Sequence, residues 1–566
     1  MTLAPVTSTF MLTAPLPDVA ATTAEDFFTT TQGRVYARAL DARDARFDGV
    51  FFVGITTTRI YCRPVCPARV AYHSHRRFFA AAAAAEQAGY RPCLRCRPEL
   101  APGRGSCDSV SRIAGAAEHR IAAGALNGHS VTDLARELHV SERHLRRALE
   151  RELGVSPLKL AQSHRLLFAK RLLADTKLPI TQIAYASGFQ SLRRFNASFA
   201  EQYRMPPSAV RRAPGAKNTP ASRAQRPDEM LRLTLAYRAP LAWDVLLDCL
   251  AGDAIGGVEV IEGRRYGRTV EIDGHTGVMF AEDASAASAP SDKTHVNVDV
   301  SASLVPALMP LLSRLRHLFD LDAQPSAIDE HLSQGGLEAL VAAHPGLRVP
   351  GAIDGFDIAL RTLLRGRARP CRAQMIDASG AQSDDVAVRV TWAIGEPLET
   401  GVPGLSRLSP TAWRVVDAGV ERLVSLGVMR GRADAAVAVA KLVAGGTLRL
   451  EPGGDVTAAR AALAAIRGVG DQVAAKLVSR ALRWPDALSP GETALQRAAK
   501  ARSSSALMAM AQRWRPWGSY AALHLRLHDE AQQSSLTARA RRGATPDLNS
   551  QEDESCRMHA HASMAS

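Results

Sequence analysis

The chain of 566 residues is 46% hydrophobic, which is enough apolar material for three or four folded domains. Its 70 basic residues outnumber its 56 acidic residues, so the net charge is +14 and the pI is near 9.7. This excess of positive charge predicts a polyanionic partner. The sequence contains no run of 18 apolar residues and no secretory signal, which excludes a membrane-spanning protein and predicts a cytoplasmic one.

The N-terminal part of the chain divides into a tail and a small mixed domain. Residues 1–25 are rich in Thr, Ala and Pro and are expected to be disordered. The region 26–105 contains a predicted strand at Phe51–Val53 and a predicted helix at Arg76–Glu86. We therefore expect a small α/β domain in this region.

Two close cysteine pairs are the most specific chemical signal in the chain. Cys62 and Cys66 form the first pair, and Cys93 and Cys96 form the second. Each short pair can span one edge of a tetrahedron, so four thiolates at this spacing suit a zinc ion. Disulfides are the competing interpretation, but eight cysteines in 566 residues do not form a disulfide framework. The sequence therefore predicts zinc as the cofactor, with all four cysteines as ligands.

The residues around these pairs carry a family resemblance. Residues 51–61 lead into the first pair, which reads Cys-Arg-Pro-Val-Cys, and Arg91-Pro92 precedes the second, which reads Cys-Leu-Arg-Cys. Residues 46–100 resemble the N-terminal domain of the Ada proteins, which take methyl groups from alkylated DNA phosphates. The resemblance implies that Cys62 is the methyl acceptor. A zinc ion with a purely structural role is the alternative.

The region 106–213 is predicted to be all-helical and basic. It holds 17 basic and 9 acidic residues, a net charge of +8. A short helix from Val131 and a second helix capped by Ser141 form one helix-turn-helix unit. A short helix from Ile180 and a second helix capped by Ser191 form another unit of the same kind. The charge and the repeated pattern predict sequence-directed DNA binding.

The second of these units carries a further resemblance. Its residues 183–195 follow the pattern IAxxxGFxSxxxF, in which Gly188 allows a left-handed turn. Paired units with this pattern resemble the AraC-type regulators, which set two reading helices into successive major grooves. The resemblance implies that four side chains face the DNA: Arg143, Arg146, Ser191 and Arg194. A helical bundle with solvated arginines is the alternative.

The composition changes after a polar linker at 214–229. Short alternating segments predict strands, which are followed by a helix and then by a nearly all-helical stretch. The predicted strands are 231–235, 258–261, 269–272 and 295–300, the helix is 304–318, and the helical stretch is 328–530. We therefore expect a sheet subdomain at 230–325, a helical domain at 326–530 and a disordered tail at 531–566.

This half of the chain resembles the AlkA-type DNA glycosylases. The segments that carry the resemblance are 237–243, 265–266, 318–321, 348–351 and 513–520. The resemblance implies a helix-hairpin-helix in which Gly468 and Gly470 let the backbone approach a DNA phosphate. It also implies flipping of an alkylated base beside a carboxylate that supports positive charge on the sugar. That position falls at Glu492, with Asp486 as the fallback.

The same half departs from the AlkA pattern at several positions. Gln472 and Lys476 stand where the family has aromatic residues, and Arg365–Pro370 replaces a Gly-Gln-Gln type turn. Glu492 stands where the family has aspartate, which moves the charge by one methylene. Cys371 lacks the following histidine of the PCHR methyl-acceptor motif found in some Ada proteins. Repair of oxygen-alkylated guanine is therefore not predicted.

The sequence as a whole predicts a multidomain α+β protein. A small zinc-binding α/β domain, an all-α double helix-turn-helix domain, an α+β sheet subdomain and an all-α helix-hairpin-helix domain follow one another. We expect an alkylation-response protein that moves methyl groups from phosphotriesters to cysteine, activates transcription and excises bases such as 3-methyladenine. Its expected partners are double-stranded DNA, both alkylated and promoter DNA, and RNA polymerase. The alternative is a DNA-binding regulator with a structural zinc and a catalytically degenerate glycosylase half.

Overall fold

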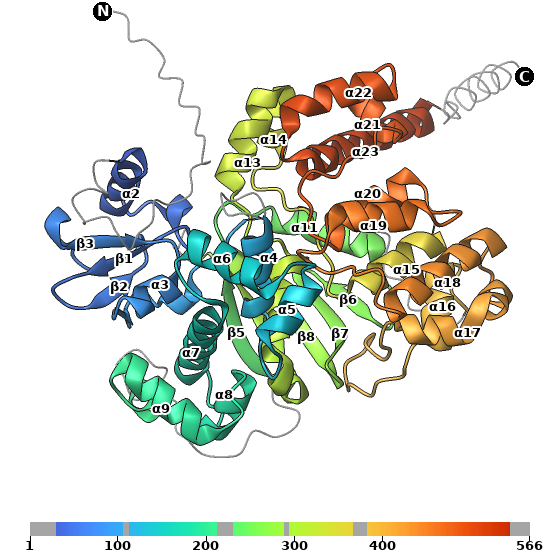
Figure 1. Cartoon of the computed structure of the whole chain (residues 1–566). Helices are drawn as coiled ribbons and strands as arrows, with labels where there is room; N and C mark the ends of the chain where they lie inside the picture. Colours follow the sequence, from blue (N-terminus) through green and yellow to red (C-terminus); the bar gives the residue numbers. More distant parts are fainter. Residues whose placement is uncertain (1–29, 106–111, 212–229, 288–293, 366–381, 544–566) are drawn as a thin grey trace, which may run out of the picture.

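The computed structural model describes residues 30–105, 112–211, 230–287, 294–365 and 382–543. Figure 1 shows a small sheet domain in blue, a helical domain in cyan and teal, a larger sheet in green, and helices from yellow to red. This is the fold class predicted from the sequence. The tail at 1–25 and the linker at 214–229 lie outside the described residues. In the described part of the chain, no helix has both the length and the hydropathy needed to cross a bilayer.

The N-terminal domain is built on a four-stranded sheet with the order β3-β1-β2-β4. Its elements are α2 (Thr31–Asp41), β1 (Phe52–Ile55), β2 (Ile60–Cys62), β3 (Arg76–Phe79), α3 (Ala82–Gln87) and β4 (Arg91–Pro92). Because side chains alternate along a strand, Val53 packs with α2 on one face while Phe52 packs with Tyr61 on the other. The parallel pairing of β2 with β4 sets Tyr61 opposite Pro92. The cysteine that follows each of these residues therefore lies at the same end of the sheet.

The structure corrects the helix predicted at Arg76–Glu86. Residues 76–79 form strand β3, which pairs with β1, and the helix begins only at Ala82. Phe78 packs on the α2 side of the sheet and Phe79 packs on the opposite side. Two adjacent aromatic residues that serve opposite faces require the period of a strand.

The helical domain matches the predicted pair of helix-turn-helix units. Its helices are α4 (Arg112–Ala122), α5 (Val131–Glu137), α6 (Glu142–Leu153), α7 (Pro157–Asp175), α8 (Ile180–Ala186), α9 (Leu192–Tyr203) and α10 (Pro207–Arg211). Ser141 caps α6 by accepting from the His144 backbone N–H at 3.2 Å, and Ser191 caps α9 through Arg194 at 3.5 Å. Gly188 adopts the left-handed conformation, with φ +81°, in the second turn.

The larger sheet has the strand order β5-β9-β8-β7-β6 and is antiparallel throughout. Its elements are β5 (Leu231–Ala236), α11 (Trp243–Asp253), β6 (Glu259–Glu262), β7 (Arg265–Ile272), β8 (His275–Asp283), β9 (His295–Val300) and α12 (Leu308–Leu318). Strand β8 was not predicted from the sequence. Its middle residues, Val278–Ala281, are buried on both faces, so they form an apolar run without alternation.

The C-terminal region is helical, as predicted. Its helices are α13 (Pro325–Leu332), α14 (Glu338–Ala343), α15 (Gly355–Arg365), α16 (Val386–Ile394), α17 (Ala412–Ser425), α18 (Arg430–Ala444), α19 (Val456–Ala464), α20 (Asp471–Arg480), α21 (Thr493–Ala498), α22 (Ser504–Ala511) and α23 (Gly518–Gly543). The disorder expected from residue 531 onward is wrong for 531–543, because α23 continues to Gly543. This stretch contains neither Pro nor Gly before that residue, so nothing in it breaks the helix. Residues 544–566 lie outside the described part.

A buried network of charged side chains joins the sheet to α15. Arg361 donates to Asp357 at 2.7 Å and also pairs with Glu259 of β6. Arg268 of β7 lies 3.2 Å from Asp357, and the Tyr266 hydroxyl donates to Glu259 at 2.6 Å. All four charged side chains are buried. The ion pairs therefore join the sheet to α15 beside apolar contacts such as that of Val278 and Phe280 with Leu405.

The two halves of the chain pack against each other. Residues of α8 and α9 belong to the same hydrophobic core as residues of β5 to β9 and α12. The buried guanidinium of Arg238 donates to the carbonyl of Asp48 at 2.7 Å, of Gly103 at 2.9 Å and of Asp322 at 2.9 Å. This side chain therefore connects the N-terminal sheet domain to the second half of the chain.

Candidate functional site

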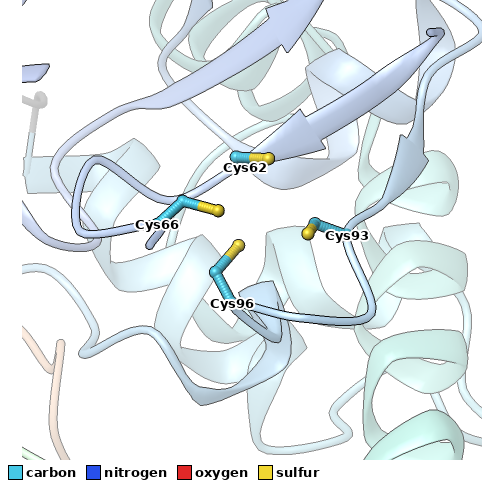
Figure 2. A group of neighbouring side chains, drawn as sticks. All are labelled: Cys62, Cys66, Cys93 and Cys96. Carbon is cyan, nitrogen blue, oxygen red and sulfur yellow. The ribbon is translucent and has the colours of Figure 1, made fainter. Parts of the chain in front are cut away.

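The four predicted zinc ligands come together in space. Figure 2 shows Cys62 at the end of β2, Cys66 in the loop after it, and Cys93 and Cys96 in the loop after β4. Their sulfur atoms point toward one another and all lie within 4.8 Å. A tetrahedral zinc ion with Zn–S bonds of about 2.3 Å requires sulfur atoms at this kind of separation. The four thiolates fit zinc, so the predicted cofactor is confirmed.

The sulfur atoms are not equivalent. Cys66, Cys93 and Cys96 are buried, whereas Cys62 is partly exposed. The backbone N–H of Arg63 donates to the Cys96 sulfur at 3.4 Å, and that of Arg95 donates to the Cys93 sulfur at 3.4 Å. Among the described residues, no backbone N–H donates to the sulfur of Cys62. Such a donor withdraws charge from a thiolate, and the partly exposed Cys62 sulfur, the most accessible of the four, receives none from the described residues.

The loop that carries the first cysteine pair is fixed by an arginine. Arg63 donates to the Asp48 carboxylate at 2.8 Å and to the Cys96 carbonyl at 3.1 Å. Asp48 itself is buried, and its carbonyl accepts from Arg238. The metal-binding loops are therefore held in place from the side of the second half of the chain.

The domain that carries Cys62 is also attached to α7, the helix between the two helix-turn-helix units. The Tyr61 hydroxyl donates to Glu86 at 2.9 Å, and Lys170 of α7 lies near this carboxylate. Burial raises the pKa of Glu86 to about 7, although hydrogen bonds from Ser163 and Tyr61 and the charge of Lys170 oppose the rise. This interface therefore contains a carboxyl group that titrates near neutral pH.

The predicted DNA contacts of the helical domain lie on two reading helices. Arg143 on α6 and both Ser191 and Arg194 at the start of α9 are exposed. Arg146 is only partly exposed, and its guanidinium donates to Glu142 at 3.0 Å. The first three are thus available to DNA, while Arg146 is engaged within its own helix. All four contacts stay predictions.

The predicted hairpin precedes α20. Gly468 has φ +93°, and Gly470 is the residue that begins the helix without a side-chain cap. Both glycines are exposed, whereas Val469 between them is buried. The backbone N–H groups at the start of α20 therefore face solvent, as an anion-binding helix terminus requires.

Glu492, the predicted carboxylate of the glycosylase half, is buried at the start of α21. Arg526 of α23 donates to its two oxygens at 2.7 and 2.8 Å. The fallback residue Asp486 is paired as well, with Arg515 at 2.8 Å. Sequence reasoning missed Arg526, because nothing near Glu492 in the sequence indicates the partner that the fold supplies.

Lys476, one of the departures from the AlkA pattern, is also part of an ion cluster. Its ammonium lies 3.0 Å from Asp253 at the end of α11, and Arg480 pairs with the same carboxylate. Burial lowers the pKa of Lys476 and opposes the ionised form of Asp253, but Lys476 and Arg480 still hold the pKa of Asp253 below its usual value. Gln472, the other departure, is exposed.

Comparisons with known families match three parts of the chain. The family described as the metal binding domain of Ada matches residues 35–99, a helix-turn-helix domain family matches 134–213, and the AlkA N-terminal domain family matches 232–354. These ranges coincide with the domain that holds the cysteine centre, with the reading helices and with the larger sheet.

One relative matches most of the chain, and two others each match a part of it. A Mycobacterium tuberculosis protein described as a probable bifunctional transcriptional activator/DNA repair enzyme AlkA is 34% identical over 495 residues, covering 86% of this chain and 95% of that protein. DNA-3-methyladenine glycosylase 2 of Escherichia coli is 29% identical and covers 52% of this chain and 95% of that protein. The Escherichia coli bifunctional activator and repair enzyme Ada is 32% identical over 26% of this chain and 40% of that protein. The chain therefore belongs to the family of bifunctional transcriptional activators and DNA repair enzymes that join an Ada-type metal-binding and helix-turn-helix half to an AlkA-type glycosylase half.

Proposed function

We propose that Cys62 accepts methyl groups irreversibly from methylphosphotriesters in DNA. The observation that carries this proposal is the asymmetry of the cysteine centre, where Cys62 has the most exposed sulfur and accepts no backbone N–H from the described residues. Bound zinc would hold the cysteines as thiolates at neutral pH. Cys62 then attacks, while Cys66, Cys93 and Cys96 remain as ligands.

The transfer balances as a single displacement. The electron pair of the Cys62 sulfur forms a bond to the methyl carbon, and the bond from that carbon to the ester oxygen breaks. Its electron pair stays on the phosphate, which becomes an ordinary diester. The thioether product does not turn over, so each molecule acts once. The centre also loses one negative charge, which weakens its repulsion from DNA and strengthens binding.

The helical domain links methyl transfer to transcription, because its helix-turn-helix units bind promoter DNA. As a member of its family, the protein is an alkylation-response transcriptional activator and DNA repair enzyme. We propose that Arg143, Ser191 and Arg194 contact promoter DNA, and that Arg146 does so only after it separates from Glu142. We further propose RNA polymerase as the protein partner and the cytoplasm as the location, because an activator of this kind works at promoters.

We propose Glu492 as the carboxylate that supports the glycosylase reaction. Its support is its position, since the Ser489 hydroxyl of the same turn donates to Asp471 at the start of α20 at 3.0 Å. Glu492 therefore lies close to the hairpin of Gly468 and Gly470. A carboxylate there would stabilise the positive charge that develops on the sugar when an alkylated base departs.

Methyl transfer is tested by incubating the full chain with methylated duplex DNA and mapping modified peptides by mass spectrometry. We expect one methyl group per molecule on Cys62, and none on Cys62→Ser, whose zinc content is measured in parallel. Methylation of a different cysteine, or of none in the zinc-loaded protein, would overturn the assignment.

Base excision is tested by release of free 3-methyladenine from alkylated duplex DNA. Glu492→Gln should lower the rate about 100-fold, whereas Glu421→Gln, which changes an exposed carboxylate of the same helical region, should leave it unchanged. A second candidate function is favoured by the pairing of Glu492 with Arg526. If the wild-type protein binds the DNA without releasing base, the second half is a DNA-binding part of a regulator.

A further inference from the structure

Two arginine–carboxylate pairs join α21 to α23. Arg526 donates to both oxygens of Glu492, and Arg497 donates to both oxygens of Asp529 at 2.9 and 2.6 Å. The two pairs have the same planar geometry and connect the same helices. Only the first involves a residue proposed to act in the glycosylase reaction, so the second is an internal control for the mechanical role of such a pair.

Glu492 and Arg526 differ in their access to solvent. The Glu492 side chain is 6% exposed, whereas the Arg526 side chain is 31% exposed. The nearby cation Lys476 is only partly exposed and is bound to Asp253. Ser489 holds the turn of Glu492 against Asp471, the first residue of α20 after the hairpin. Arg526 is therefore a solvent-accessible cation beside the surface where the proposed function puts DNA.

The pair as it stands opposes the reaction. A carboxylate whose two oxygens both accept from a guanidinium is electrically neutralised by it. The positive charge of that guanidinium would also repel the positive charge that forms on the sugar. A DNA phosphate also offers two unesterified oxygens, and arginine binds both phosphates and carboxylates bidentately.

We propose that DNA takes Arg526 away from Glu492. In the free protein the guanidinium holds the carboxylate, and in the complex the guanidinium binds a backbone phosphate while the carboxylate becomes free to face the sugar. Arg526 is thus a positioning residue that makes Glu492 available only on DNA. This inference rests on the proposed role of Glu492.

The first test is the salt dependence of binding to a short duplex that carries one abasic-site analogue and no operator sequence. The affinity falls as salt is added, and loss of one phosphate contact makes the slope of log affinity against log salt shallower by about 1. We expect this loss in Arg526→Gln, a restored slope in Arg526→Lys, and an unchanged slope in Arg497→Gln. An unchanged slope in Arg526→Gln would overturn the exchange.

The second test is the single-turnover rate of base release at saturating DNA. Arg526→Gln should bind about 10-fold more weakly but should react within about threefold of the wild-type rate, because its Glu492 is already free. A rate at least tenfold lower, with Arg497→Gln unaffected, would overturn the proposal, since the pair would then be needed during the reaction. If the wild-type protein releases no base, the glycosylase proposal fails, while the salt slopes still decide whether Arg526 binds phosphate.

Discussion

The cysteine centre and the glycosylase half hold their charged side chains in place by different means. The cysteine centre gathers four ligands from two short loops of one small domain, and a single ion suffices to hold them. The glycosylase half relies on arginine–carboxylate pairs whose members come from distant elements, such as Glu259 of β6 with Arg361 of α15, and Glu492 with Arg526. The cysteine centre is local and depends on the bonds between one metal ion and its ligands. The ion pairs of the glycosylase half depend on the whole tertiary structure.

The two sites differ in how they tolerate the loss of a residue. A metal site fails as a unit when a buried ligand is lost, because the three buried cysteines together hold the order of both loops. An ion-pair network loses its members one at a time, and each loss leaves an unpaired buried charge. Substitutions in the two regions should therefore have effects that differ in kind as well as in size.

The largest effect is expected from loss of a buried zinc ligand. Cys93→Ser should lose zinc and the order of both cysteine loops, because a structural zinc ion contributes about 10–16 kcal/mol to the folding of small domains. Zinc content and amide hydrogen exchange over residues 60–100 measure this. Cys249→Ser, which changes a buried cysteine of α11, should keep its zinc. If Cys93→Ser still bound zinc fully, the metal site would not fail as a unit, and this difference from the ion-pair network would be wrong.

A smaller effect is expected from the buried network of the glycosylase half. Arg361→Met leaves Glu259 and Asp357 with Arg268 as their one remaining cation among the described residues, and breaking such a buried pair costs about 3–5 kcal/mol. The urea midpoint of the second half measures this loss. Arg430→Met, which breaks an exposed pair with Glu421, should leave the midpoint unchanged. Equal effects of the two variants would contradict the role given to the buried network.

A pH-dependent effect is expected where the cysteine domain meets α7. Burial raises the pKa of Glu86 from 4.5 to about 7, so the folded protein binds this proton more tightly than the unfolded chain does. The free energy of unfolding should therefore fall as the pH rises from 4.5, the pKa of Glu86 in the unfolded chain, through about 7, its pKa in the folded protein. Glu86→Gln should melt at a higher temperature than the wild type at about pH 8 and at the same temperature at about pH 4. Glu338→Gln, at an exposed position on α14, should show no such difference.

The smallest effect concerns the N-terminal cap of the first reading helix, a hydrogen bond that involves neither a metal nor an ion pair. Ser141→Ala removes the cap of α6 and should cost about 1 kcal/mol, whereas Ser141→Gly should cost only a few tenths. Thermal unfolding and promoter binding of the two variants measure this difference. Identical losses in both would mean that Ser141 acts through something other than its capping hydroxyl.

The cysteine centre could be predicted from the sequence because its information is local. The spacing of Cys62, Cys66, Cys93 and Cys96 is enough to indicate a tetrahedral metal, and the serine caps of the reading helices are equally local signals. The helix predicted at Arg76–Glu86 was wrong in its first part, because pairing with β1 decides the conformation of Phe78 and Phe79. The middle of strand β8, Val278–Ala281, lacks alternation because its side chains are buried on both faces.

For the glycosylase site, the sequence indicates the position of the carboxylate but not the residues that contact it. Counting from the hairpin gives Glu492, but the residue that neutralises it lies on another helix, and no pattern near Arg526 indicates this contact. The same holds for Asp253, which accepts Lys476 and Arg480 from α20. Side chains that meet only through tertiary packing carry no spacing signal.

The shared core of the reading domain and the glycosylase sheet limits what one molecule can do at a time. Because α8 and α9 are built into the same apolar core as β5 to β9, a molecule that occupies a promoter holds its glycosylase at one fixed angle to that DNA. It cannot scan for lesions elsewhere until it dissociates. Promoters and damaged bases therefore compete for a single pool of protein. The number of copies in the cell, divided between these two classes of DNA, sets how much repair continues while the response is switched on.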